Sequence, residues 1–294
     1  MFVKYLTATA ITISYLYGAI INVLVTSLMK VSIITATYNS AKTIKDTVLS
    51  VAHQTYKHIE HIIIDGCSTD NSLNIAGHFG HTGPLLCEPD NGIYDAMNKG
   101  VIMATGDIIG ILNSDDFYPD AQVIEKVVKV FESGDCDAVY GDLVYVDPNN
   151  TKTVLREWIA GSYNKKLFYK GWMPPHPTFF VRKEIYEKYG LFNLSFKSSS
   201  DYELLLRFLF LKEVKVKYLH DILVHMRAGG YSNRSIKNRI AAHLEDRRAW
   251  KVNCISPKWY TVALKPLSKV NQFFIPRQPD YSESLFLKTL FSSE

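Results

Sequence analysis

The chain has 294 residues, of which 47% are hydrophobic and 21% are charged. These values are ordinary for globular proteins and exclude a disordered chain, a collagen-like repeat and a disulfide scaffold. The 33 basic and 29 acidic residues give a net charge of +4, without the concentrated basic footprint of a nucleic-acid-binding protein. The four cysteines form no CxxC pair, which argues against a structural zinc site and favours a reducing cytosol.

Residues 1–29 form a separate hydrophobic segment. From Tyr5 to Met29 there is no charged residue, and a helix of this length would measure about 37 Å, enough to cross a hydrocarbon core of ~30 Å. A single N-terminal span followed by Lys30 predicts that the rest of the chain lies in the cytoplasm, associated with the inner membrane. The alternative is that Met29 is the natural start and the preceding residues are not part of the protein. Hydropathy alone leaves both explanations open.

The segment of about 30–141 alternates short β-branched runs with segments of helical period. This pattern predicts a Rossmann-like half with a mostly parallel sheet between helices. The predicted strands are Val31–Thr35, Ile59–Ile64, Asp107–Leu112 and Ala138–Tyr140. The predicted helices are Ala41–His53, Asn71–Phe79, Tyr94–Ala104 and Ala121–Phe131.

The segment of about 142–240 forms a smaller second half that we expect to complete the site for a second substrate. The runs DLVYVD and TKTVLREW flank Pro148-Asn149-Asn150 and predict a β-hairpin. A helix is predicted over about Asp201–Leu211. The remaining 241–294 is an aromatic and basic C-terminal extension, in which several prolines favour a packed helical extension over a membrane-surface helix.

Polar residues follow the predicted strands at the sheet edge where ligands bind in such folds. Asp65 stands at the tip of the second strand, where it can accept from a base N–H or a ribose hydroxyl. Asp115 and Asp116 adjoin each other after the third strand, and such neighbours repel unless a cation or a set of donors holds them. A hard divalent ion, Mg²⁺ or Mn²⁺, is the economical explanation. An acidic turn capped by Asp116 is the alternative.

The ordered series VSIITATYNS, HIIIDGCSTDNS, DNGIYDAMNKG and DIIGILNSDDFY resembles the family 2 glycosyltransferases, from about Lys30 to Ser232. The resemblance implies an α/β GT-A fold, a single Rossmann-like mixed sheet flanked by helices, with a smaller acceptor-side half and a C-terminal extension. The stretch DNGIYDAMNKG is similar to a subgroup associated with bacterial colanic acid, capsules and O-antigens.

The resemblance also implies residue roles. The DxD motif of the family falls on Asn113-Ser114-Asp115, with Asp115 as the metal ligand and Asn113 and Ser114 at the nucleotide-sugar. The first position is Asn rather than Asp, a departure common enough in the family to leave metal dependence expected. The remaining residues expected at the nucleotide-sugar are Thr35, Thr37 and Asn39 in the pocket, Asp65 at the base, and Asp90, Asn98 and Lys99 near the ribose and diphosphate.

On the acceptor side, the resemblance makes Asp201 the catalytic base, with Glu203 in reserve. An N-cap is the structural alternative for Asp201. His176 is expected near the acceptor or the diphosphate. Arg227 is expected to reach the phosphates from a flexible lid that includes Gly229-Gly230.

The predicted activity is an inverting, metal-dependent transfer of a sugar from a nucleotide donor, with UDP as the default, to a glycan or polyprenyl-linked acceptor. Inversion follows from the resemblance. A sugar-phosphate nucleotidyltransferase is a second hypothesis, but ATYNSAKT lacks the glycine-rich basic loop that such an enzyme needs. A catalytically inactive nucleotide-sugar-binding scaffold is a third, and the presence of both Asp115 and Asp201 counts against it.

Overall fold

A computed structural model describes residues 28–229 and 236–261 of the chain. Its strands are β1 (Val31–Thr37), β2 (Ile59–Asp65), β3 (Leu85–Cys87), β4 (Ile108–Ile111), β5 (Ala138–Val146), β6 (Val154–Trp158), β7 (Phe180–Arg182) and β8 (Val216–Arg227). Its α-helices are α2 (Ile44–Ala52), α3 (Ser72–His78), α4 (Ile93–Met103), α5 (Val123–Glu132), α6 (Lys183–Tyr189), α7 (Ser200–Leu205) and α8 (Ile236–Val252). Shorter turns are η1 (Lys165–Lys170), η2 (His176–Thr178) and the π-helical turn η3 (Leu206–Leu211).

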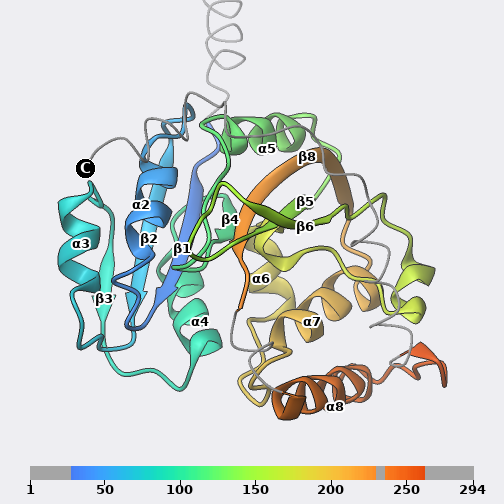
Figure 1. Cartoon of the computed structure of the whole chain (residues 1–294). Coiled ribbons are helices and arrows are strands. Elements are labelled where there is room, and N and C mark those ends of the chain that lie inside the picture. The colour runs from blue at the N-terminus through green and yellow to red at the C-terminus, as the bar shows by residue number, and fades with distance from the viewer. Residues whose placement is uncertain (1–27, 230–235, 262–294) are drawn as a thin grey trace, which may run out of the picture.

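The strands form one mixed sheet in the order β3-β2-β1-β4-β7-β5-β6, and β8 pairs with β5 (Figure 1). The strands β3, β2, β1 and β4 run parallel, whereas β7 is antiparallel to both β4 and β5. The antiparallel β7 therefore joins the Rossmann-like half to the second half within one continuous sheet. The prediction of a single mixed sheet flanked by helices is confirmed.

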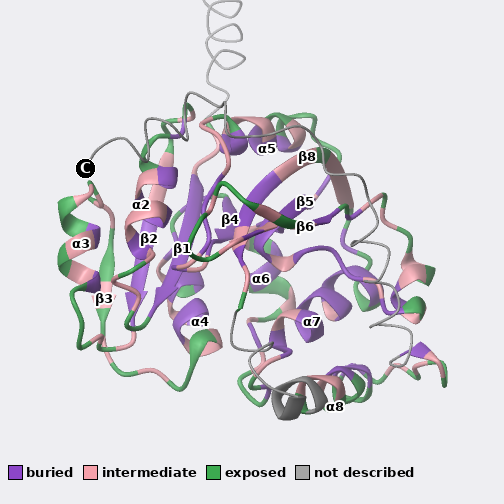
Figure 2. Cartoon of the chain, viewed as in Figure 1, coloured by how far each residue is buried: buried purple, intermediate pink, exposed green. Residues whose placement is uncertain are grey.

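Alternation along β2 places helices on both faces of the sheet. Ile62 and Ile64 pack in the main core, which also contains Ala96 of α4, whereas Ile63 packs with Ile44 of α2 on the other face. Every residue of β1 is buried, including its polar residues Ser32, Thr35 and Thr37 (Figure 2).

Gly100 allows α4 to approach β1 closely, because a Cβ at this position would lie 2.3 Å from Ile34 Cγ2. The close approach fixes the helix that contains residues 93–100 of the DNGIYDAMNKG stretch, of which Gly100 is the last residue. The glycine of that stretch thus has a packing role.

The predicted elements are recovered with shifted ends. The predicted hairpin is β5–β6, and the predicted helix over 201–211 is α-helical only to Leu205 before η3. The elements missed by the sequence prediction are β3, α6 and the long strand β8. The predicted start of the C-terminal extension at 241 falls inside α8, which packs along α7 (Figure 1).

No helix within residues 28–229 and 236–261 is both long and apolar enough to cross a membrane. The predicted hydrophobic segment of 1–29 lies outside the described residues apart from its last two. Most of the predicted aromatic and basic extension, 262–294, lies outside them as well.

Candidate active site

Asp65 ends β2 as a completely buried carboxylate whose position is set by the loop that follows it. Ser68 donates to it twice, from its backbone nitrogen at 2.8 Å and from its hydroxyl at 2.6 Å. The Cys87 thiol at the end of β3 donates to Asp65 Oδ2 at 3.3 Å. The carboxylate is therefore held rigidly at the carboxyl edge of the sheet, as a base-binding group must be.

Asp90 approaches the same end of the site from another loop. A Cβ at Gly66 would lie 2.5 Å from Asp90 Oδ2 and 3.4 Å from Tyr38 Cδ2, so only glycine lets these three segments meet. Asp90 Oδ1 accepts a 2.8 Å hydrogen bond from the Gly92 nitrogen. The ring of Tyr38 is 63% exposed, which leaves it free to stack on a planar base. The structure thus brings Asp65, Asp90 and Tyr38 together.

The three polar residues expected in the nucleotide pocket, which lie in or just after the first strand, have different surroundings. Thr35 is completely buried and its hydroxyl lies 2.9 Å from His61 Nε2, so it supports the sheet from inside. Thr37, the register partner of Asp65, has a buried hydroxyl oxygen without a hydrogen-bond partner among the described residues. Asn39 has a φ of 51° and accepts from the Thr69 nitrogen at 2.8 Å, which ties the loops after β1 and β2 together.

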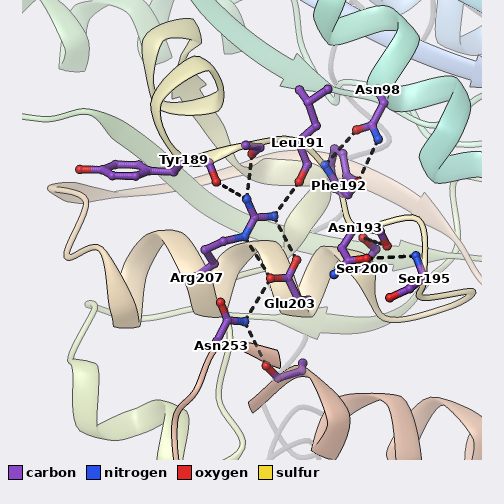
Figure 3. Close-up of polar contacts among 12 residues, drawn as sticks. Asn98, Tyr189, Leu191, Phe192, Asn193, Ser195, Ser200, Glu203, Arg207 and Asn253 are labelled. Atoms are coloured by element: carbon purple, nitrogen blue, oxygen red, sulfur yellow. Dashed lines mark hydrogen bonds and ion pairs between the residues drawn. The ribbon is translucent and has the colours of Figure 1, made fainter. Parts of the chain in front are cut away.

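The polar atoms of Asn98 and Lys99 are hydrogen-bonded to other parts of the protein. The Asn98 amide donates to the Phe192 carbonyl and accepts from the Phe192 nitrogen, both at 2.9 Å, so its polar atoms are used for holding the second half (Figure 3). Lys99 donates to the Pro89 carbonyl at 2.9 Å and pairs with Glu88 at 2.8 Å. Asn98 thus holds the second half and Lys99 fixes the loop that carries Asp90, while the expected contacts of these residues with ribose and diphosphate stay predictions.

The two carboxylates in the loop after β4 differ in how deeply they are buried. Asp116 is completely buried and accepts from the Asn113 amide at 3.1 Å; burial, and then the neighbouring Asp115 carboxylate, raise its pKa well above the ordinary value. Asp115 is only half-buried. The hydroxyl of Ser114 lies 2.8 Å from that of Ser40, which links this loop to the loop after β1. Asp115 is therefore the less buried of the two carboxylates.

Arg227 is not part of a lid. It ends β8, is only 6% exposed, and donates to the Asp115 carbonyl at 2.7 Å while it pairs with Asp46 of α2. β8 extends the sheet up to Arg227, so this residue belongs to a strand and not to the expected loop, and its contact with phosphates stays a prediction. The only sequence feature that suggested a loop here was the pair of glycines after Arg227. Gly230 and Ser232, which were expected in the same lid, lie outside the described residues.

A divalent ion fits the Asp115 loop on chemical grounds. Such ions are bound in transferases by one or two carboxylates together with substrate phosphates and water. Asp115 offers one carboxylate, and Asn113 Oδ1 is a buried oxygen without a hydrogen-bond partner in the described part of the chain. Among the same residues, no cluster of three or more His, Cys, Asp or Glu side chains could hold an ion by itself.

Asp201 lies in the first turn of α7, where two other elements hold its oxygens. The Tyr94 hydroxyl of α4 donates to Oδ1 at 3.0 Å, and His176 Nδ1 lies 3.1 Å from Oδ2. Burial, and then the Asp201 carboxylate, raise the pKa of Tyr94 well above its usual value, so the phenol stays a donor. The three residues border a narrow cavity that also contacts Ile111, the last residue of β4. Asp201 therefore adjoins the strand that leads to the Asp115 loop.

Glu203 is a structural residue. Its carboxylate, 2% exposed, makes two 3.0 Å contacts with Arg207, whose guanidinium also donates to the carbonyl oxygens of residues 189–191 (Figure 3). Asn253, just after α8, donates to Glu203 Oε1 at 3.1 Å. Both carboxylate oxygens of Glu203 are bonded inside the protein, so Glu203 is not a reserve base. Of the two residues, Asp201 is the remaining candidate for the base.

Sequence reasoning missed Glu245 on α8, which holds the start of α7. Its carboxylate accepts from the backbone nitrogens of Lys197, Ser198 and Ser199 at 2.8–3.0 Å, and from the Ser198 hydroxyl. Charge-assisted contacts of this kind are the strong ones, and they fix the segment directly before Asp201. No local pattern around residue 245 signals this contact across 46 residues or more.

A mixed GT-A sheet, with a base-end carboxylate, an acidic loop after β4 and a separate carboxylate on α7, defines a nucleotide-sugar-dependent transferase. The model of the family described as Glycosyl transferase family 2 matches residues 32–190. A PGL/p-HBAD biosynthesis glycosyltransferase of Mycobacterium bovis is 30% identical over 219 residues, covering 72% of this chain and 83% of the relative. The chain belongs to glycosyltransferase family 2 and is a glycosyltransferase.

Solved structures share the fold. Staphylococcus aureus TarS, residues 1–349, in complex with UDP-GlcNAc has a TM-score of 0.61 and 18% identity, over 76% of this chain and 65% of that TarS chain. The mannosyltransferase PcManGT from Pyrobaculum calidifontis, in complex with GDP-Man and Mn²⁺, has a TM-score of 0.55 and 16% identity, over 92% of this chain and 89% of that protein.

Proposed function

We propose that this protein is an inverting, divalent-metal-dependent glycosyltransferase that moves a sugar from a nucleotide donor, UDP by default, to a glycan or lipid-linked acceptor. The observation that carries the proposal is the Asp201 carboxylate, held by Tyr94 and His176 beside the strand that leads to Asp115. This arrangement offers one base and one metal carboxylate. A direct displacement requires no more.

The proposed roles follow from position. Asp65 and Asp90, with Tyr38, bind the base and ribose. Asp115 holds Mn²⁺ or Mg²⁺, which when bound neutralises the leaving diphosphate as a Lewis acid. Asp201 takes the proton of the acceptor hydroxyl, a contribution of about 10²–10⁴-fold in rate. His176 and Tyr94 orient that carboxylate.

The proposed acceptor belongs to bacterial surface glycans, either capsule or O-antigen polysaccharides or glycolipids. The similarity of DNGIYDAMNKG supports the polysaccharides, and the similarity to a mycobacterial PGL/p-HBAD biosynthesis glycosyltransferase supports a glycolipid. The proposed location is the cytoplasmic face of the inner membrane. Its support is the apolar composition of residues 5–29 and the lysines that follow.

The experiment that tests the donor half is a thermal-shift and donor-hydrolysis screen of the 294-residue chain. UDP-, GDP- and dTDP-sugars are each tested with Mn²⁺, Mg²⁺ or EDTA, for wild type and for Asp115→Asn. The matched control is Asp135→Asn, an acid on the exposed turn before β5. We expect metal-dependent stabilisation by one nucleotide class, abolished in Asp115→Asn and kept in Asp135→Asn. A folded wild type that binds none of the donors would overturn the proposal.

The scaffold hypothesis makes a different prediction. A binding subunit without catalysis would show the same nucleotide stabilisation but no metal-dependent hydrolysis or transfer. Asp201→Asn separates the two, because loss of turnover with retained donor binding requires a catalytic role for this carboxylate. Full transfer by Asp201→Asn would place the base elsewhere.

A further inference from the structure

Two of the four cysteines lie together at the base end of the donor site. Cys87 ends β3 and is the register partner of Asp65, and Cys67 stands two residues after Asp65. Both are exposed, whereas Cys136 is buried. The pairing of β2 with β3 thus brings together two thiols that are 20 positions apart in the sequence.

The Cys87 thiol contacts the group expected to bind the base. Cys87 Sγ donates to Asp65 Oδ2 at 3.3 Å. The Asp65 carboxylate, and after it the adjacent Cys67 side chain, raise the pKa of the Cys87 thiol to about 11. Cys67 itself has a φ of 61°, in the left-handed region that a residue with a side chain rarely adopts. Sugar transfer gives no role to either thiol.

We propose that Cys67 and Cys87 form a reversible oxidation site, at which a hydroperoxide converts the two thiols into a disulfide that closes the base end of the donor pocket. The formation of the disulfide rests on the placement of the two cysteines, because β3 pairs Cys87 with Asp65 and Cys67 follows Asp65 by two residues. Its effect on nucleotide binding rests on the proposed function, because it acts through Asp65.

The chemistry balances in two steps. The Cys67 sulfur attacks hydrogen peroxide and breaks its O–O bond, which gives Cys67 sulfenic acid and water. The Cys87 sulfur then attacks the sulfenic sulfur, forms the S–S bond and expels the second oxygen as water. The proton of the Cys87 thiol, which that thiol now donates to Asp65 Oδ2, passes to the departing hydroxide and completes this water molecule. The two sulfurs lose two electrons, and the peroxide gains them.

The disulfide would change the pocket in two ways. It removes the thiol hydrogen that Cys87 donates to Asp65. It also draws the loop of residues 66–68 towards β3, because disulfide Cβ atoms lie about 3.5–4.5 Å apart. Ser68 in that loop makes two of the contacts that fix Asp65. We expect the oxidised protein to bind nucleoside diphosphate at least about tenfold more weakly, since a tenfold change needs only ~1.4 kcal/mol.

The test treats the full chain with hydrogen peroxide and maps disulfides by mass spectrometry before and after dithiothreitol. Calorimetric titration with UDP, GDP and dTDP, each with Mn²⁺, is run on the reduced, oxidised and re-reduced protein. The variants are Cys67→Ser and Cys87→Ser, each compared with its own reduced form. Cys254→Ser is the matched control, because Cys254 is an exposed cysteine outside this site.

We expect a Cys67–Cys87 disulfide in wild type and in Cys254→Ser, and weaker nucleotide binding that dithiothreitol restores. Neither effect should occur in Cys67→Ser or Cys87→Ser. Absence of this disulfide while Cys254 is oxidised overturns the site, and a disulfide that leaves binding unchanged overturns its effect on the pocket. If the reduced protein binds none of the three nucleotides, the proposed function fails, whereas the disulfide map still decides the oxidation site.

Discussion

Arg227 Nη1 lies 2.7 Å from the carbonyl oxygen of Asp115, a residue 112 positions earlier in the chain. The same guanidinium pairs with Asp46 of α2 and lies 5.1 Å from the centre of the Phe117 ring. One buried cation at the end of β8 therefore holds the backbone of the proposed metal loop against the Rossmann-like half.

Replacing Arg227 tests this support. Arg227→Ala leaves Asp46 without its buried partner and is expected to lower the free energy of unfolding by about 3 kcal/mol. Arg227→Lys keeps the charge but loses the planar fork that reaches both partners, so it should fold and bind Mn²⁺ with UDP more weakly. Urea unfolding and calorimetry measure the two effects. Arg247→Ala, on the exposed face of α8, is the control, and equal metal affinity in wild type and Arg227→Lys would contradict the assignment.

Replacing Asp201 tests the base. Asp201→Asn should lower the transfer rate by about 10²–10⁴-fold and leave donor affinity unchanged, because the donor contacts lie elsewhere. Tyr94→Phe removes one hydrogen bond to this carboxylate and should cost roughly tenfold. The measurement is kcat alongside UDP affinity. A fall in donor affinity that matches the fall in rate would show that Asp201 acts on the donor instead.

Glu245 should affect catalysis from α8 without touching a substrate. Glu245→Ala removes the acceptor of three backbone N–H groups before α7 and should lower the free energy of unfolding by about 2 kcal/mol. Because Asp201 follows directly, kcat should also fall while UDP affinity is kept, and Glu245→Gln should recover part of both losses. The control is Glu187→Gln, which alters an exposed i,i+4 pair of little energetic weight. Unchanged stability in Glu245→Ala would contradict this role.

Acid should destabilise the fold through buried histidine. Burial, and then the charge of His81, lower the pKa of His61 to about 3, while the unfolded residue titrates near 6.5. The unfolded state therefore binds a proton that the folded state does not, and stability falls as pH drops from about 6.5 towards 3, by up to ~1.4 kcal/mol per pH unit. Above this window His61 contributes no pH dependence. His225, whose pKa burial lowers to about 4, acts in the same direction.

Urea unfolding at pH 7.5, 6 and 5 measures this dependence. His61→Gln should flatten the acid slope, because it removes the group that protonates only on unfolding. His78→Gln changes an exposed histidine and should leave the slope as in wild type. An identical slope in wild type and His61→Gln would show that His61 is not the neutral buried group described above.

The sequence predicted those features whose signals are local. The local pattern placed Asp65 and Asp115 directly after strands, whereas the resemblance to the family selected Asp201; the structure has these positions, and the roles of the three carboxylates stay predictions. Asn98 and Arg227 were assigned to ligands, whereas their partners lie 94 and 112 positions away in the chain. In a sequence, a polar side chain that hydrogen-bonds to a distant backbone group cannot be told from one that binds a substrate.

The strand β8 shows the same limit for the fold. Its residues Val216–Arg227 are mostly half-buried, and the two glycines after it suggested a loop. Only its pairing with β5, which no short pattern encodes, makes it a strand. The switch from α7 to η3 likewise has no sequence marker, since Leu206–Leu211 continues the apolar character of the helix.

The contact between Arg227 and Asp115 also determines how late the proposed metal loop can be completed during translation. At a synthesis rate of about 5–20 residues per second, the 112 residues that separate them take roughly 6–22 s to make. During that interval the nascent Rossmann-like half has its first strands but neither the cation under the Asp115 loop nor the α8 carboxylate before Asp201. A ribosome-bound chain is thus expected to acquire nucleotide binding late, and catalytic competence only after α8 has emerged.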